Sequence, residues 1–163
     1  MYLRAMQPED WPAVRDIYLA GIATGIATFQ TGAPPYEQWD SSHLPDCRLV
    51  AQGESGALLG WAALSPTSAR PVYRGVVEVS IYIAPESRGK GVGRALLTAL
   101  GEQAEQQGYW TLVSSVFAEN AASRGLHRAC GFREVGVREK IARGADGQWH
   151  DTVLLERRSK SIL

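Results

Sequence analysis

The chain has 163 residues, of which 45% are hydrophobic and 21% are charged. This composition is typical of one soluble globular domain and excludes a disordered or fibrous protein. Lysine plus arginine equals aspartate plus glutamate at 17 each, so no overall charge attracts nucleic acid or a membrane surface. Cys47 and Cys130 are the two cysteines, and no signal-peptide pattern accompanies them, which predicts reduced thiols in a cytoplasmic protein.

The first half of the chain combines two helix patterns with three strand patterns. Apolar residues recur at helical spacing between Trp11 and Ile22, and the acidic residues just before them favour the start of a helix. Gly53–Gly56 has the composition of a hairpin turn between two apolar segments. The elements expected here are a strand over 2–6, a helix that begins at 8–11, a loop over 24–32, a short helix from 34 to 44, and strands over 48–52 and 57–65.

The second half contains the longest strand pattern. Val76–Ala84 is rich in β-branched residues, which predicts a central strand, and Gly108 predicts a cap at the end of the helix after it. The order of elements predicts an α/β (α+β) fold in one domain over 1–163, with a central mixed, mostly antiparallel sheet flanked by four helices. The remaining elements are a strand over 76–84, a helix over 92–107, a strand over 109–117, a helix over 120–131, and strands over 132–141 and 148–156.

A glycine-rich basic turn, Arg88–Arg94, joins the predicted central strand to the next helix. Its three glycines allow the backbone to approach a ligand closely. A helix N-terminus also presents unpaired N–H groups and the positive end of a dipole, and such a turn binds phosphate. The spacing fits neither the dinucleotide fingerprint nor the ATP-type loop. A basic turn without a ligand is the alternative.

Two motifs resemble those of the GNAT superfamily of N-acetyltransferases. Residues 88–93 read Arg-x-x-Gly-x-Gly, similar to the acyl-CoA pyrophosphate loop of that family. Residues 120–132 resemble its Asn-x-x-Ala/Ser-x-x-Leu-Tyr-x-x-x-Gly-Phe motif. The resemblance implies the GNAT fold, with acetyl-CoA as co-substrate and no metal, although Asn120 is equally suited to capping a helix. The residues implied to bind the co-substrate are Ile81, Tyr82, Ile83, Arg88, Gly89, Lys90, Gly91, Val92, Gly93, Arg94, Asn120 and Ser123.

Five further features are similar to the phosphinothricin and methionine sulfoximine acetyltransferase group within that superfamily. One is a histidine at position 127, where most of the superfamily has tyrosine. The others are spread over the chain, which makes the resemblance specific to the group. The five features are His127, Trp149-His150-Asp151, Ala27–Thr31, Arg70-Pro-Val-Tyr73 and Glu78–Ile83.

Glu78 and His127 are the candidate catalytic residues. Attack on a thioester requires a free amine, so a base must take a proton from the ammonium form of the acceptor. Glu78 is expected to be half-buried between Val77 and Val79, which raises a carboxyl pKa toward neutrality. An outward-facing or ion-paired Glu78 is the alternative. His127 is a second base, an acid for the departing thiolate or a core histidine, and which of the two residues is the base stays open.

The acceptor is expected to contact two loops and the last hairpin. Arg70, and with it Arg74, is suited to hold a carboxylate as a bidentate pair, unless both are solvated loop residues. His150 is either a contact of the acceptor or an ordinary hairpin residue. The residues expected to contact the acceptor are Phe29, Thr31, Arg70, Tyr73, Arg74 and His150.

The function implied by the resemblance is direct transfer of an acetyl group from acetyl-CoA to the α-amine of a small amino-acid analogue. Phosphinothricin, methionine sulfoximine and methionine sulfone are the acceptors of this type. The group also implies a homodimer, with no nucleic-acid or membrane partner. The alternatives are acetylation of another amine, such as a protein N-terminus or a polyamine, and a non-catalytic CoA-binding sensor.

Overall fold

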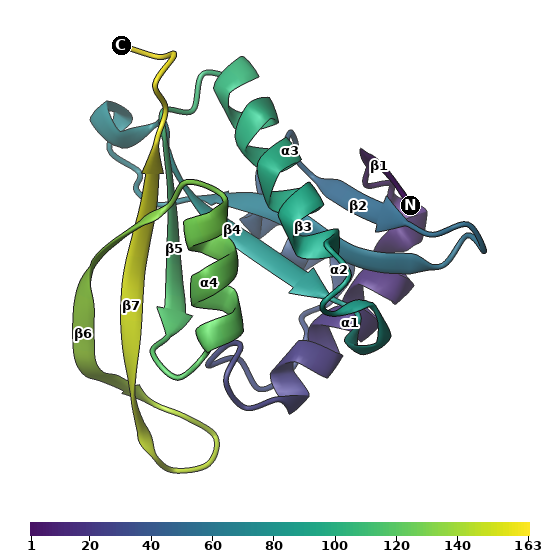
Figure 1. Ribbon diagram of the computed structural model, residues 1–163, viewed down its shortest axis with the longest axis horizontal. Coiled ribbons are helices and arrows are strands. Elements are labelled where there is room, and N and C mark those ends of the chain that lie inside the picture. The colour runs from purple at the N-terminus through teal and green to yellow at the C-terminus, as the bar shows by residue number, and fades with distance from the viewer.

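A seven-stranded mixed sheet forms the centre of the computed structural model, which describes residues 1–163 (Figure 1). Its strands are β1 (Tyr2–Ala5), β2 (Leu49–Gln52), β3 (Leu58–Pro66), β4 (Val76–Ile83), β5 (Thr111–Phe117), β6 (Arg133–Arg143) and β7 (Trp149–Arg158). The strand order is β1-β2-β3-β4-β5-β7-β6, and all neighbours are antiparallel except β4 and β5. The predicted sheet and its mostly antiparallel pairing are therefore confirmed.

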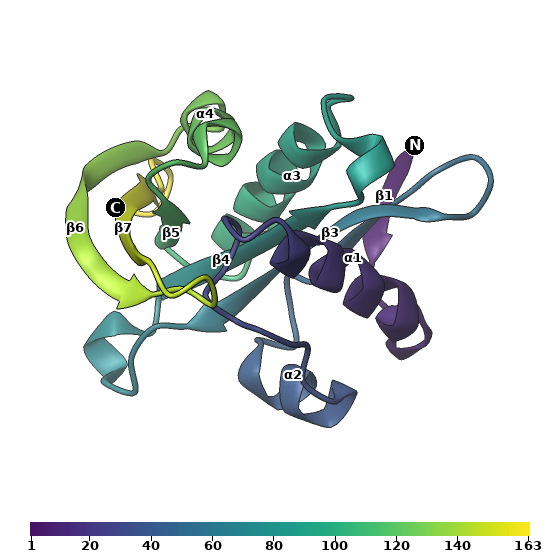
Figure 2. The same cartoon turned by 90° about the horizontal axis from the view of Figure 1, so that it is seen from below.

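Four helices cover the sheet, two on each face (Figure 2). Their order and positions agree with the sequence predictions to within a few residues. Short 3-10 turns precede three of the elements, each beginning at a proline, a residue that suits the first position of a helix. The helices are α1 (Trp11–Ala23), α2 (Tyr36–Ser42), α3 (Val92–Gln106) and α4 (Ala121–Ala129), and the 3-10 turns are Pro8–Asp10, Pro71–Tyr73 and Pro85–Ser87.

The larger core lies between α3 and the sheet. Leu96, Leu97 and Leu100 of α3 are fully buried and pack on apolar residues of β3 and β4 such as Leu64 and Val77. Leu100 lies one helical turn beyond Leu96 and Leu97 on the same face, which is why α3 docks in a single orientation. Burying a leucine side chain stabilises a fold by roughly 1.5–3 kcal/mol, so this helix is firmly fixed. Gly108 caps it in a left-handed conformation (φ 85°), as predicted.

The smaller core, on the other face, is aromatic. Val14 and Ile17 of α1 and Trp39 of α2 pack with Val50 and Trp61 of the sheet. Side chains alternate between the two faces of a strand, so β3 supplies Trp61 to this core and its neighbours to the leucine core. This aromatic cluster fixes α1 and α2, and so both ends of the loop between them.

Strands β4 and β5 are paired only where they begin. Their parallel register runs over three residue pairs, from Val76 with Thr111 to Glu78 with Val113. Beyond that point the strands separate, and a gap opens between residues 79–83 of β4 and 114–117 of β5 (Figure 1). The helices of the structure include none that is long and apolar enough to cross a membrane.

Candidate active site

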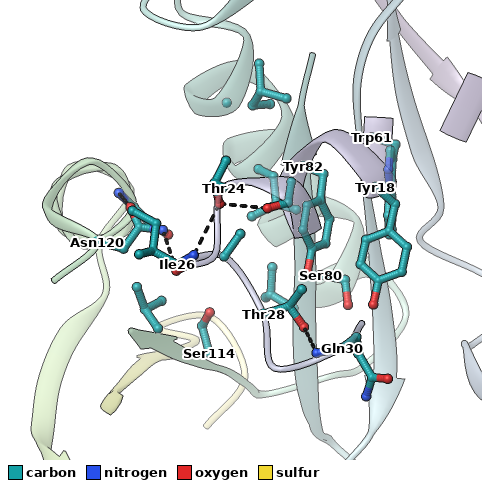
Figure 3. Close-up of a pocket in the computed structure, with 18 of the residues that line it drawn as sticks. Tyr18, Thr24, Ile26, Thr28, Gln30, Trp61, Ser80, Tyr82, Ser114 and Asn120 are labelled. Atoms are coloured by element: carbon teal, nitrogen blue, oxygen red, sulfur yellow. Dashed lines mark hydrogen bonds between the residues drawn. The ribbon is translucent and has the colours of Figure 1, made fainter. Parts of the chain in front are cut away.

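The gap between β4 and β5 opens into a cavity of about 1200 Å³. Its walls come from the ends of both strands, the N-terminal turn of α3, the first turns of α4, and the loop 24–34 between α1 and α2. Figure 3 shows side chains from these segments around one space, with Ser80 and Tyr82 of β4 on one side and Asn120 of α4 on the other. Segments far apart in the sequence thus meet at the point where the sheet is open.

The glycine-rich turn presents free backbone amides to this cavity. The amides of residues 89–94 donate no hydrogen bond within the chain, and the first bonded amide is that of Ala95, 3.1 Å from the oxygen of Gly91. Gly89 and Gly91 have φ of 72° and 82°, a left-handed conformation that favours glycine. Six unpaired N–H groups at a helix N-terminus form an anion site. All the predicted residues of this turn line the cavity except Lys90, which is exposed.

The open edge of β4 offers a second set of unpaired backbone groups. The amide of Ala84 donates to the carbonyl oxygen of Leu59 in β3 at 2.8 Å. Because the direction of backbone groups repeats at every second residue, the amide and carbonyl of Tyr82 also point toward β3. Backbone groups alternate in direction along a strand, and those of Ile81 and Ile83 therefore point into the gap. An extended chain with amide groups, such as a pantetheine arm, can pair with such an edge.

Glu78 lies where the two strands part, and it lines the cavity. Val77 and Val79 on either side of it are buried, as expected, while Glu78 itself opens to the cavity. Its carboxylate makes no hydrogen bond or ion pair. The walls around it nevertheless raise the pKa of Glu78 by displacing bulk water, and the charge of Arg138 opposes this shift. The raised pKa agrees with the expectation for a general base.

His127 stands on α4 and is 1% exposed, although it lies on the cavity wall. Its Nδ1 is 2.7 Å from the oxygen of Ser123, so Nδ1 carries the proton and donates it there. Its Nε2 has no partner. Burial lowers the pKa of His127 while the bond to Ser123 opposes the shift, so the ring is neutral at pH 7 and Nε2 is a proton acceptor.

Asn120 caps α4 and also fastens the loop 24–34. Its Oδ1 accepts from the amide of Ser123 at 3.1 Å, which confirms the predicted cap. Its Nδ2 donates to the oxygen of Ile26 at 3.3 Å, as Figure 3 shows. Within the loop, the amide of Gln30 donates to the hydroxyl of Thr28 at 3.1 Å. The cap of one helix therefore holds the segment that closes the cavity.

The predicted contacts of the acceptor fall into two sets. Phe29 and Thr31 line the cavity, as expected. Arg70, Tyr73 and Arg74 do not: they are exposed on the turn before β4, with Arg70 over the ring of Tyr73 at 5.3 Å and Arg74 over that of Trp110 at 5.5 Å. The turn lies at the closed end of the gap, where β4 and β5 begin. Within one chain these three residues lie outside the cavity, and their contact with the acceptor stays a prediction.

His150 lies behind the cavity wall and does not line the cavity. Its Nδ1 is 2.7 Å from Oε1 of Glu119, and its Nε2 is 3.2 Å from both carboxylate oxygens of Asp146. The ring also packs against Phe117, which contacts Phe29 with ring centroids 4.4 Å apart. Asp146 and Glu119 raise the pKa of His150 by binding its ring nitrogens, and the ring ties the last hairpin to the loop before α4.

Several wall residues were not predicted. They are aromatic or small side chains of α1, α2 and the strands around the gap between β4 and β5. Nothing in the local sequence distinguishes them from ordinary core residues. The main ones are Tyr18, Trp39, Trp61, Ser80, Ser114, Ser115, Phe117 and Thr152. The structure contains no group of three or more histidine, cysteine, aspartate or glutamate side chains placed to hold a metal ion.

Comparison with known proteins finds a matching family model and similar curated proteins. Residues 8–132 match the model of the acetyltransferase (GNAT) family. The phosphinothricin N-acetyltransferase of Alcaligenes faecalis is 36% identical over 165 residues, covering 95% of this chain and 81% of that protein. The L-methionine sulfoximine/L-methionine sulfone acetyltransferase of Pseudomonas aeruginosa is 38% identical over 108 residues, covering 66% of this chain and 62% of that protein.

Two solved structures agree with the fold over nearly the whole chain. A phosphinothricin acetyltransferase of Sinorhizobium meliloti in complex with acetyl-CoA is 28% identical, with a TM-score of 0.87 and coverage of 99% of this chain and 94% of that one. A ribosomal-protein-alanine N-acetyltransferase of Brucella melitensis is 30% identical, with a TM-score of 0.89 and coverage of 98% and 100%. On its fold, its motifs and these matches, the chain belongs to the GNAT family of acetyltransferases.

Proposed function

We propose that this chain transfers an acetyl group from acetyl-CoA to the α-amine of a small amino-acid analogue of the phosphinothricin, methionine sulfoximine or methionine sulfone type. The observation that carries the proposal is that the unpartnered carboxylate of Glu78 and the free amides of residues 89–94 line one cavity. The first is suited to activate an amine and the second to bind a diphosphate. The similarity to the Alcaligenes and Pseudomonas enzymes supports the type of acceptor.

The chemistry assigned to Glu78 is removal of a proton from the acceptor. An ammonium group has no lone pair, so the carboxylate takes one proton and the free amine then attacks the thioester carbonyl directly. The raised pKa of Glu78 brings its basicity closer to that of the group it deprotonates. Both substrates occupy the cavity together, in a ternary complex without a covalent enzyme intermediate.

His127 is the second proton acceptor of the site in this proposal. Because its Nδ1 proton is bound to Ser123, the neutral ring can accept a proton or a hydrogen bond at Nε2 but cannot donate one there. This favours the role of a second base over that of an acid for the departing thiolate. It also leaves Glu78, which is exposed to the cavity, as the residue that meets the acceptor first.

The test is an assay of free thiol on adding acetyl-CoA with a panel of amines. Methionine sulfone, methionine sulfoximine and phosphinothricin form one arm of the assay. Spermidine and a peptide with an N-terminal alanine form the other arm. The expected result is rapid thiol release in the first arm only. Turnover of the peptide alone would instead support the activity named for the Brucella neighbour, and no turnover with any amine in the folded protein would leave a CoA-binding sensor.

The variant Glu78→Gln separates an enzyme from a binding protein. The substitution keeps the size of the side chain and removes its basicity. We expect kcat to fall by about 10²–10⁴-fold, the usual contribution of a general base, while titration calorimetry shows unchanged affinity for CoA. The matched control is Glu86→Gln, an exposed glutamate in the 3-10 turn before α3 that does not line the cavity; it should leave both quantities unchanged.

We also propose that the protein is a homodimer joined through its last hairpin. Strand β6 is an edge strand of the sheet, and it exposes apolar side chains, as does the neighbouring strand. The exposed apolar residues of the hairpin are Val135, Val137, Ile141 and Trp149, at 42%, 57%, 49% and 53% exposure. Exposed apolar groups on a sheet edge favour association with a second chain.

The two free cysteines suit a reducing compartment such as the cytoplasm.

A further inference from the structure

The cavity extends past the reacting groups to a far end beneath α2. The residues that line it there include Gln38, Trp39, Ser42 and His43, which belong to that helix or directly follow it. None of them has a part in the chemistry assigned to Glu78 or in the anion site before α3. An acceptor of the proposed type has a polar head group at the end of its side chain, so this far end is suited to receive it; the inference rests on the proposed function.

Backbone hydrogen bonds place His43 close to an acceptor held at Glu78. The amide of Leu44, the next residue, donates to the oxygen of Leu64 in β3 at 2.8 Å, and Leu64 is opposite Val79 of β4. The segment that ends α2 therefore runs beside β3 at the level of Glu78. A distance of two strand spacings, each about 4.8 Å, separates that segment from β4.

Glu78 and His43 also lie on the same face of the sheet. Side chains four residues apart in a strand share a face, so Glu78 points to the same side as Tyr82, which packs against the aromatic core. His43 stacks on Trp39 of that core, with ring centroids 4.2 Å apart. Ser80, on this face of β4 as well, lines the cavity with a small side chain (Figure 3), which leaves room for a ligand.

His43 offers a hydrogen-bond acceptor at the cavity wall. Its Nδ1 is 2.7 Å from the oxygen of Trp39, so Nδ1 carries the proton and donates it there. Burial lowers the pKa of His43, and the charge of Arg48 adds to this against the bond to Trp39, so the ring is neutral at pH 7. Its Nε2 makes no hydrogen bond and is not enclosed by the protein, which leaves a lone pair for a ligand.

The same end of the cavity has a donor without a partner. Trp61 is 1% exposed, packs edge-on against Trp39 and lines the cavity. Its Nε1 is one of two buried side-chain atoms that have no hydrogen-bond partner in the chain, and the other, Nε2 of His127, also belongs to a residue of the cavity wall. Buried indole N–H groups are normally paired, so this wall is complete only with an oxygen that the protein does not supply.

We propose that the far end of the cavity binds the head group of the acceptor's side chain, with Nε2 of His43 accepting a hydrogen bond from an N–H group of the acceptor. From its amine to its sulfur, an extended methionine derivative spans roughly 5 Å over four bonds. A hydrogen bond of about 3 Å at each end lets it reach both Glu78 and His43.

This contact distinguishes two head groups of nearly equal size. The sulfur of methionine sulfoximine carries one oxygen and one N–H group, whereas that of methionine sulfone carries two oxygens. A sulfoximine can donate to Nε2, but a sulfone places an oxygen lone pair against the lone pair of the ring. His43 is therefore a specificity-determining residue that favours the sulfoximine.

The experiment measures free thiol at pH 7 with these two acceptors, which differ only in an N–H group in place of one oxygen. His43→Phe keeps a flat ring on Trp39 and His43→Leu keeps an apolar side chain, and both remove Nε2. We expect kcat/KM of the wild type to be about fivefold higher for the sulfoximine, the usual effect of one neutral hydrogen bond. The ratio should fall to about one in both variants. The control Glu37→Gln, exposed on α2 and outside the cavity, should keep the wild-type ratio.

The ratio compares two acceptors in one preparation, so it does not depend on the fraction of a variant that is folded. A wild-type ratio near one would overturn the role of His43, as would a ratio that both His43 variants leave unchanged. Turnover of either acceptor by the wild type keeps the proposed function in both cases. If the wild type turns over neither acceptor, the proposed function fails, and the assignment of His43 fails with it.

Discussion

Gly91 stands at the turn where the chain enters α3, with φ of 82° and no atom within 4 Å of the position a Cβ would take. An alanine there has room but is strained by about 1–2 kcal/mol, and its methyl group lies beside the free amides. We expect Gly91→Ala to lower both the melting temperature and the affinity for CoA, measured by thermal unfolding and calorimetry. Gly147→Ala is the matched control, because Gly147 has φ of 79° and equal space in a distant turn. Equal CoA affinity in both variants would contradict the anion site.

His127 makes stability depend on pH in a defined window. Burial lowers its pKa below the ordinary histidine value of about 6.5, so below pH 6.5 the unfolded chain takes up a proton that the folded chain does not. Stability therefore falls as the pH drops from 6.5 toward the lowered pKa, by up to about 1.4 kcal/mol per pH unit for one such group. Urea unfolding at pH 7 and pH 5 should show a smaller loss in His127→Gln than in the wild type. An unchanged loss would mean that His127 is protonated in the folded state.

His150 changes the stability of the fold with pH in the opposite direction, and over a higher pH range. The carboxylates of Asp146 and Glu119 raise its pKa, so its contribution is complete below pH 6.5 and is lost as the pH rises through the raised value. His43 is half-buried and its pKa is lowered, as for His127, so both residues contribute to the loss of stability of the wild type on the acid side. The change that remains in His127→Gln is therefore the balance of a loss from His43 and a gain from His150 as the pH falls.

At the scale of elements, one side chain couples α4 to the loop 24–34. Asn120 holds the amide of Ser123 with its oxygen and the carbonyl of Ile26 with its nitrogen. Asn120→Asp keeps the cap and loses the tether, whereas Asn120→Ala loses both. We expect near wild-type stability for the first and a loss of about 1 kcal/mol for the second, with a raised acceptor KM in both. Urea unfolding and steady-state kinetics measure the two effects, and a normal KM in Asn120→Asp would show that the tether does not position the loop.

The sequence was sufficient for the elements but not for every residue of the site. Periodic apolar residues and caps such as Gly108 predicted each helix and strand, and the two motifs predicted the turn before α3, because these signals are local. The direction of the turn that carries Arg70 is set by packing of its side chains on Tyr73 and Trp110. That packing is a tertiary feature which no local pattern reports, and the same holds for wall residues such as Ser80 and Phe117, which line the cavity where β4 and β5 separate.

At the scale of the whole molecule, the apolar residues of the last hairpin predict the state of association. Val137 is 57% exposed on the edge strand β6. We expect Val137→Arg to shift the protein from dimer to monomer, because a buried and unpaired charge at an interface costs several kcal/mol. Size-exclusion chromatography with light scattering measures the mass. Leu19→Arg, at a 40% exposed residue of α1, is the control and should leave the mass unchanged; a monomeric wild type would contradict the proposal.

The separation of β4 from β5 has a consequence for the protection of single backbone positions. Within β4, the amide protons of Ser80 and Tyr82 point to β3, whereas those of Ile81 and Ile83 point into the open gap. Solvent deuterium should replace the second pair within seconds to minutes and the first pair only when the sheet itself opens. Alternate residues of one continuous strand would then differ by orders of magnitude in exchange rate, and nuclear magnetic resonance would record the outline of the cleft without any bound ligand.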